Sequence, residues 1–158
     1  MDQRVGFEAD RGTDSADALR LWLRLFATAN QVEAELARRL RAEFAMTLPR
    51  FDLMAQLAKA GEGVTLGELS RRLMVTNGNV TGLVDRLVED GLVERKVRRA
   101  DRRSAMVRLT EEGAERFAAM AKVHRGWVEE LFGALDPESR THLSALLKTA
   151  RDSVAERT

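Results

Sequence analysis

Two short segments of this sequence carry the side chains best suited to chemistry, and that chemistry is nucleic-acid recognition. The first segment is V75-T-N-G-N-V-T-G-L-V-D-R86, which is rich in asparagine and threonine. Asparagine can bind adenine through two hydrogen bonds, threonine can contact a thymine methyl group, and arginine can bind guanine or phosphate. The candidate contact residues of this segment are Thr76, Asn77, Gly78, Asn79, Thr81 and Arg86.

The second segment is strongly basic. Residues 94–108 hold seven arginines and lysines against two acidic residues, a net charge of +5; the whole chain carries +1, so the rest carries −4. Positive charge concentrated in this way suits a polyanion such as double-stranded DNA, whereas a solvated charged surface is the alternative. The candidate contact residues here are Arg98, Arg99, Asp101, Arg102, Arg103 and Ser104.

The apolar spacing of the first segment predicts a helix over residues 76–90. Asn77-Gly78 between valines is a strong hairpin signal, but from Val80 the apolar residues recur at 83, 84, 87 and 88, which is helical spacing. Thr76 is suited to the N-cap of this helix, and Gly91 to its C-terminal stop. The polar candidates then lie on or beside the face opposite the apolar residues.

Gly78 and Gly82 lie on that outer face. Each costs roughly 1 kcal/mol relative to alanine in a helix interior. A helix pressed into the major groove benefits from them, because the missing Cβ lets the backbone approach the DNA. The alternative is a weak, frayed helix, and the neighbouring basic segment favours the first interpretation.

The rest of the chain is expected to supply the elements that position these two segments. Two consecutive helices followed by a β-hairpin form a winged helix-turn-helix, so the predicted fold class is mainly α with a small β-wing. This lobe is expected to span residues 45–110. The expected elements are a flexible tail at 1–13, helices at 14–44 and 47–61, a strand at 63–64, helices from Thr65 and at 76–90, strands at 92–98 and 105–110, and helices from Thr110 and Asp136. Thr47, Thr65, Thr110 and Asp136 are the expected N-caps. One apolar stripe is expected along the whole fifth helix, through Phe117, Met120, His124, Trp127, Leu131 and Leu135.

The sequence resembles a known family. The strings V80-T-G-L-V-D-R-L-V-E-D-G-L-V-E-R95 and D101-R-R-S-A-M-V-R-L-T-E-E-G113 are similar to the signature of the MarR (multiple antibiotic resistance regulator) family, and the likeness covers roughly residues 18–155. It implies a homodimeric transcriptional regulator, usually a repressor, that a small ligand releases from a pseudo-palindromic operator. It also implies that segments 14–44 and 111–157 form the dimer interface.

The family pattern implies roles for residues of the wing. An Asp and the Arg two positions later stabilise the wing loop and reach the minor groove, and Asp101 and Arg103 match these positions. Asp101 is equally suited to a simple turn. The chain departs from many relatives at Gly82, where they carry a large, often basic residue. Base reading is therefore expected to depend on Asn77, Asn79, Thr81 and Arg86.

The residue inventory limits what such a regulator could sense. The absence of cysteine excludes thiol oxidation, and two histidines make a transition-metal site improbable. Arg50 lies on the apolar side of its helix, where it could pair with a ligand carboxylate, phenolate or phosphate, or reach water. The string T47-L-P-R-F-D-L-M-A-Q-L57 resembles the hydroxycinnamoyl-CoA-responsive type, which implies an aromatic acid or its CoA thioester as inducer. The candidate ligand residues are Trp22, Phe26, Arg50, Phe51, Met54, Met120 and His124, with core packing as the alternative for the apolar and aromatic ones.

Other classes of protein fit the sequence less well. An enzyme would need a nucleophile and a base together, but Ser104 and Asp101 fall in the predicted wing and His124 in a predicted dimer helix. We expect no cofactor, since the chain lacks a glycine-rich phosphate loop. No apolar run or signal-peptide pattern points to a membrane, so a cytoplasmic protein is expected. A winged helix used for protein–protein contact is the remaining alternative.

Overall fold

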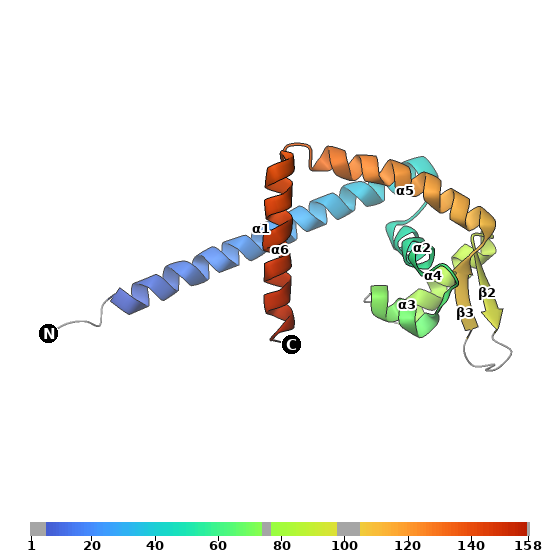
Figure 1. Ribbon diagram of the computed structural model, residues 1–158, viewed down its shortest axis with the longest axis horizontal. Helices are drawn as coiled ribbons and strands as arrows, with labels where there is room; N and C mark the ends of the chain where they lie inside the picture. The colour runs from blue at the N-terminus through green and yellow to red at the C-terminus, as the bar shows by residue number, and fades with distance from the viewer. Residues whose placement is uncertain (1–5, 74–76, 98–104, 158) are drawn as a thin grey trace.

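The computed structural model describes residues 6–73, 77–97 and 105–157. The described elements are α1 (Gly6–Phe44), α2 (Leu48–Ala60), β1 (Val64–Thr65), α3 (Leu66–Leu73), α4 (Asn77–Glu89), β2 (Val93–Val97), β3 (Ala105–Leu109), α5 (Glu111–Leu131) and α6 (Pro137–Ala155). This order confirms the predicted fold class. Helices α2, α3 and α4 and the sheet gather at one end of the molecule and form a lobe, while α1 and α6 reach away from it (Figure 1).

The hydrophobic core lies inside this lobe. It is completed by the last turns of α1, through Leu40, and by the middle of α5, through Met120. The residues of this core that are no more than 1% exposed are Leu40, Met46, Leu53, Met54, Leu57, Leu69, Val80, Val84, Leu87, Leu92, Val107 and Met120. Because these side chains come from every helix of the lobe and from the sheet, α4 belongs to one packed unit.

The three strands form an antiparallel sheet in the order β1-β3-β2. Val107 of β3 lies opposite Val64 of β1 on one side and opposite Arg95 of β2 on the other. The short strand predicted at 63–64 is therefore confirmed one residue later. Gly63 precedes it with φ +113°, and a Cβ there would lie 2.9 Å from the Val107 carbonyl oxygen, so only glycine fits.

Helix caps agree closely with the sequence analysis. The side chains of Thr65, Thr110 and Asp136 each accept a hydrogen bond from the backbone amide three residues later, at 3.2, 3.0 and 2.9 Å. Thr47 occupies the N-cap of α2 with extended backbone, but its side chain makes no capping hydrogen bond. Of the four predicted caps that the structure describes, three thus satisfy orphan amides of their helices, and Thr47 has only the expected position; the fifth, Thr76, lies outside the described residues.

Two helix boundaries differ from the prediction. Helix α1 begins at Gly6, so residues 6–13 continue the helix that we expected to start at Asp14. This stretch contains no proline, and Gly12, its one glycine beyond the first residue Gly6, lowers helix stability without breaking the helix. Helix α5 ends at Leu131, so Leu135 lies beyond it. Just after this end, the Gly133 amide donates a hydrogen bond to the Glu130 carbonyl at 3.0 Å.

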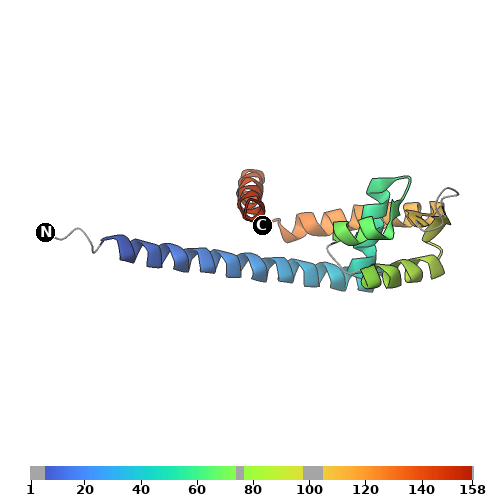
Figure 2. The ribbon, with the colours of Figure 1, turned by 90° about the horizontal axis from the view of Figure 1, so that it is seen from below.

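Residues 15–26 of α1 and all of α6, which we call the helical arms, leave their large apolar side chains uncovered. Trp22 is 55% exposed and Leu146 is 56% exposed, and α6 has no buried residue. Figure 2 shows α1 as a single long rod extending away from the lobe, with α6 seen nearly end-on beside it. No helix in the described ranges has both the length and the apolar content that crossing a bilayer requires.

Candidate nucleic-acid interface

Helix α4 has a buried face and an exposed face, as its spacing predicts. Val80, Val84 and Leu87 are fully buried in the core. Gly78, Asn79, Gly82 and Arg86 are exposed on the other side, and the Arg86 side chain retains 75% of its accessible surface. The segment is therefore a helix and not a hairpin turn, and most of its polar candidates face outward.

Neither glycine on the exposed face has a neighbour that requires it. A Cβ added to Gly78 or Gly82 would meet no atom within 4 Å, apart from atoms of the helix itself. Alanine would fit both positions and would favour the helix by roughly 1 kcal/mol at each. Packing within the described chain thus gives no reason for glycine here, whereas close approach of another molecule does.

The C-terminal end of α4 closes with a Schellman motif. Gly91 has φ +73°, its amide donates to the Val88 carbonyl at 3.0 Å, and the Leu92 amide donates to the Leu87 carbonyl at 2.9 Å. This arrangement satisfies carbonyls that the helix end would leave unpaired. It confirms Gly91 as the stop of this helix.

Three other elements hold α4 in place near this end. Arg95 of β2 pairs with Asp85 at 2.5 Å, and Arg50 of α2 forms an ion pair with Asp90. The Thr110 hydroxyl, at the start of α5, donates to the Gly91 carbonyl at 2.7 Å. The orientation of α4 therefore depends on contacts with β2, α2 and α5 as well as on its apolar face.

Part of the basic segment is neutralised within the chain. Arg95 is paired with Asp85, and Arg108 forms an ion pair with Glu94 across the β2–β3 ladder, while Lys96 is exposed. The six candidate residues of the wing tip, together with Thr76 and the side chain of Asn77, lie outside the described residues. They are Arg98, Arg99, Asp101, Arg102, Arg103 and Ser104.

The structure brings some of the candidate ligand residues together. Phe51 of α2 stacks on His124 of α5 at 4.7 Å between ring centroids, and Met54 lies in the adjoining core. Burial lowers the pKa of His124 below its usual value of 6.5. Two rings that the ligand prediction omitted, Phe117 and Trp127, extend this aromatic cluster at 5.4 Å from Phe51 and 6.5 Å from His124. Their spacing with His124 on the fifth helix was the signal for them.

The other candidate ligand residues lie elsewhere. Trp22 and Phe26 contact each other at 5.5 Å on the arm of α1, where both are more than half exposed. The Arg50 side chain is only 17% exposed and points to Asp90, so it does not simply reach water. Its Nε is buried and has no hydrogen-bond partner among the described residues. One chain thus separates the predicted ligand residues into an α1 pair and a group on α2 and α5.

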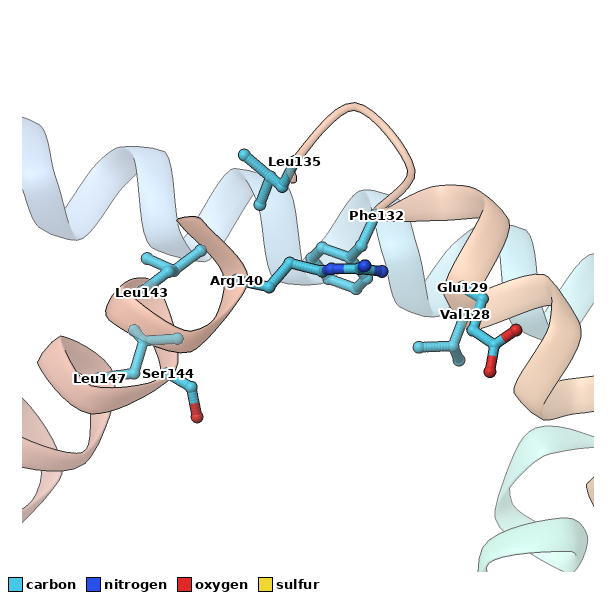
Figure 3. A pocket seen from close by; sticks show the side chains of 8 residues that line it. All are labelled: Val128, Glu129, Phe132, Leu135, Arg140, Leu143, Ser144 and Leu147. Carbon is cyan, nitrogen blue, oxygen red and sulfur yellow. The ribbon is translucent and has the colours of Figure 1, made fainter. Parts of the chain in front are cut away.

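Two open cavities lie near α5. One, of about 320 Å³, lies between the end of α5 and α6 and is mainly apolar, with the Arg140 side chain extending from α6 among its lining residues (Figure 3). The other, of about 490 Å³, is bounded by Arg38, Arg39 and Trp127. Hydrogen bonds from Arg38 and Arg39 lower the pKa of Glu35 to about 2 beside it. Among the described residues, no group of three histidines or carboxylates is placed to hold a metal ion.

Comparison with known proteins adds an independent finding. The family model of the MarR family matches residues 46–104. The transcriptional activatory protein BadR of Rhodopseudomonas palustris is 33% identical over 135 residues, covering 83% of this chain and 77% of BadR. The crystal structure of a MarR family transcriptional regulator from Silicibacter pomeroyi aligns with a TM-score of 0.75 at 35% identity, covering 89% of this chain and 97% of that one. A mutant MarR from E. coli in complex with operator DNA aligns with a TM-score of 0.74 at 26% identity, over 85% and 95% of the two chains.

Proposed function

Because this chain belongs to the MarR family of DNA-binding transcriptional regulators, we propose that it acts as a homodimeric repressor whose operator binding responds to a small ligand. The observation that carries the proposal is the exposed face of α4, with two glycines that no packing contact explains. Two such helices, one from each chain, would enter successive major grooves of a pseudo-palindrome about 34 Å apart. The wings would add minor-groove and phosphate contacts through Asp101, Arg103 and their neighbours.

The helical arms support the homodimer. Their exposed apolar residues on α1 and α6 form stripes that one chain leaves uncovered. Contiguous exposed apolar surface of this kind is typical of protein–protein interfaces. A second copy of the chain, contributing the same two helices, would bury them and would set the distance between the two α4 helices.

The DNA-binding proposal is tested with a duplex that the wild-type protein selects from a randomised library. Asn79→Ala is expected to reduce the difference in affinity between the selected duplex and an unrelated one, because a base contact is lost. Arg103→Ala is expected to weaken binding to both duplexes. It should also make the affinity less steeply dependent on salt concentration, by the equivalent of about one phosphate contact per protomer. Binding that is insensitive to salt and to sequence would instead support the protein-contact alternative.

The proposed inducer is an aromatic carboxylate or its CoA thioester. The aromatic cluster on α2 and α5 supports the aromatic part of this ligand, since rings stack on rings. Arg50, elsewhere on α2, offers a guanidinium that can pair with a carboxylate. Thermal unfolding with benzoate- and cinnamate-type acids, their CoA thioesters and free CoA tests it. A ligand at 100 times its dissociation constant is expected to stabilise the protein by about 2.7 kcal/mol. No shift with any of these compounds would refute the aromatic-acid proposal and leave the DNA-binding one intact.

Activation is a second candidate role, because the relative BadR is named a transcriptional activator. Both roles use the same DNA interface and differ in where the operator lies relative to the promoter. Transcription in vitro from a genomic promoter of the source organism that contains a match to the selected duplex distinguishes them. A lower transcript yield on adding the protein supports the repressor, and a higher yield supports the activator.

A further inference from the structure

The ion pair between α2 and the end of α4 has a functional consequence beyond stability. We infer that Arg50 is a positioning residue for DNA binding: it acts through Asp90 to fix the orientation of the helix that reads the operator. The inference rests on the proposed role of α4, since it concerns how that helix is held. Neither residue needs to contact DNA for the effect to arise.

Arg50 is placed to act inside the protein. It lies in the first turn of α2 with 17% of its side chain exposed, and its ion-pair partner Asp90 directly follows the last residue of α4. A guanidinium this far from water costs free energy unless it is paired. The buried Nε, unpartnered among the described residues, leaves the Asp90 carboxylate as the charged group that compensates it.

Helix α4 needs such a directional contact. Its buried side consists of apolar residues, and apolar contact is not directional, so a helix resting on Val80, Val84 and Leu87 alone can rock. The Arg50–Asp90 pair and the hydrogen bond from Thr110 to the Gly91 carbonyl come from two different helices. Together they fix the C-terminal end of α4 from α2 and from α5.

A small tilt at this end has a large effect at the other. The helix has 13 residues and is therefore about 20 Å long, so a tilt of about 3° displaces its first turn by about 1 Å. That first turn carries Gly78 and Asn79, which are proposed to face the bases. A hydrogen-bonded base contact does not tolerate a displacement of this size. An anionic ligand that takes Arg50 from Asp90 would likewise release the helix, which connects this pair to the proposed induction.

The experiment is a double-mutant cycle on the wild-type-selected duplex, with Arg50→Gln, Asp90→Ala and the double variant. Each single variant is expected to bind the selected duplex about tenfold more weakly, which is the effect of losing one good base contact. The double variant should lose no more than either single one, and an unrelated duplex should be bound as before. Arg50→Lys keeps the charge and should recover most of the affinity.

Glu130→Gln is the matched control. It breaks the Arg39–Glu130 ion pair, which also joins two helices and has a similarly shielded arginine, but which connects α1 with α5 and involves no residue of α4. This variant should bind both duplexes like the wild type. Folding of every variant is checked by circular dichroism at the assay temperature, and if Arg50→Gln does not fold, Asp90→Ala alone carries the test.

Three results would overturn the inference: wild-type affinity in Asp90→Ala, additive losses in the double variant, or equal losses on both duplexes. In each of these the wild type still selects a duplex, so the proposed function stands. If the wild type selects no duplex at all, the proposed function fails, and with it the premise of the inference.

Discussion

The lobe and the helical arms of this protein treat apolar surface in opposite ways. In the lobe, apolar side chains of every helix meet inside one chain, and Leu53, Leu69 and Leu87 have no exposed surface. In the arms, side chains of the same type at the same spacing stay in the open, as Leu21 does with 67% of its surface. Helical periodicity therefore shows that a face is to be buried, but not whether its partner belongs to the same chain.

The largest expected effect comes from placing a charge on an arm. Leu147→Asp puts a carboxylate on the apolar side of α6, where it would be buried without a counter-ion at both symmetry-related positions of a dimer. We expect the dimer dissociation constant to rise about a hundredfold or more, measured by sedimentation equilibrium. The lobe should keep its fold, because no core residue lies on α6.

Ala145→Asp is the control for this variant. Ala145 lies on the opposite side of α6, so the same charge there should leave the dimer intact. If both variants dimerise like the wild type, α6 is not part of the interface, and the contrast between lobe and arms needs another explanation.

A smaller effect is expected on the exposed face of the lobe, where one substitution should stabilise the fold and weaken DNA binding. Gly82→Ala should raise the free energy of unfolding by about 1 kcal/mol, since the added Cβ meets open space and helix propensity improves. The same change should weaken binding to the selected duplex about tenfold, because the Cβ stands between the backbone and the groove. Chemical denaturation and a DNA-binding titration measure the two quantities on one sample.

Gly126→Ala provides the comparison. Gly126 lies inside α5 but outside the lobe, and a Cβ added there would also meet nothing within 4 Å. This variant should gain similar stability without losing DNA affinity. A Gly82→Ala variant that gains stability and binds the duplex like wild type would mean that α4 does not approach DNA closely.

The smallest effect concerns His124, where α5 passes from the arms to the lobe. Its pKa in the folded protein lies below the unfolded value of about 6.5 because burial disfavours the charged ring. The folded state then binds fewer protons, so wild-type stability should fall as the pH drops through 6.5. His124→Phe should remove this part of the loss, seen as a flatter melting temperature between pH 7.5 and 5.5. A His124→Phe curve parallel to the wild-type curve would contradict the burial argument.

Much of the lobe could be predicted from local patterns. The spacing of Val80, Val84 and Leu87 outweighed the Asn77-Gly78 turn signal, because a helix that buries three side chains gains more than an isolated turn. Gly91 and Thr110 were recognisable because helix ends need specific groups to satisfy their backbone. The predicted start of α1 was wrong by eight residues, because a polar segment without proline carries no strong signal that a helix stops there.

The long-range pairs could not be predicted. Arg50 was recognised as unusual on the apolar side of α2, but nothing in the sequence indicates that Asp90, forty positions later, faces it. Nor does local spacing show that Trp22 and Phe26 pair with each other on the exposed arm, while Phe51 stacks on His124. Such contacts depend on how helices cross, which the tertiary packing decides. The roles of the DNA-binding and ligand residues stay predictions for the experiments above.

The separation of the two faces of α4 bears on how regulators of this kind diverge. Its inward residues carry the core, while Gly78, Asn79, Gly82 and Arg86 carry almost none of it. Mutations on the outer face therefore cost the fold little stability, and a duplicated gene can accumulate them without losing a folded product. Its descendants could acquire new target promoters one substitution at a time, and an engineer could follow the same route by randomising these four positions on an unchanged scaffold.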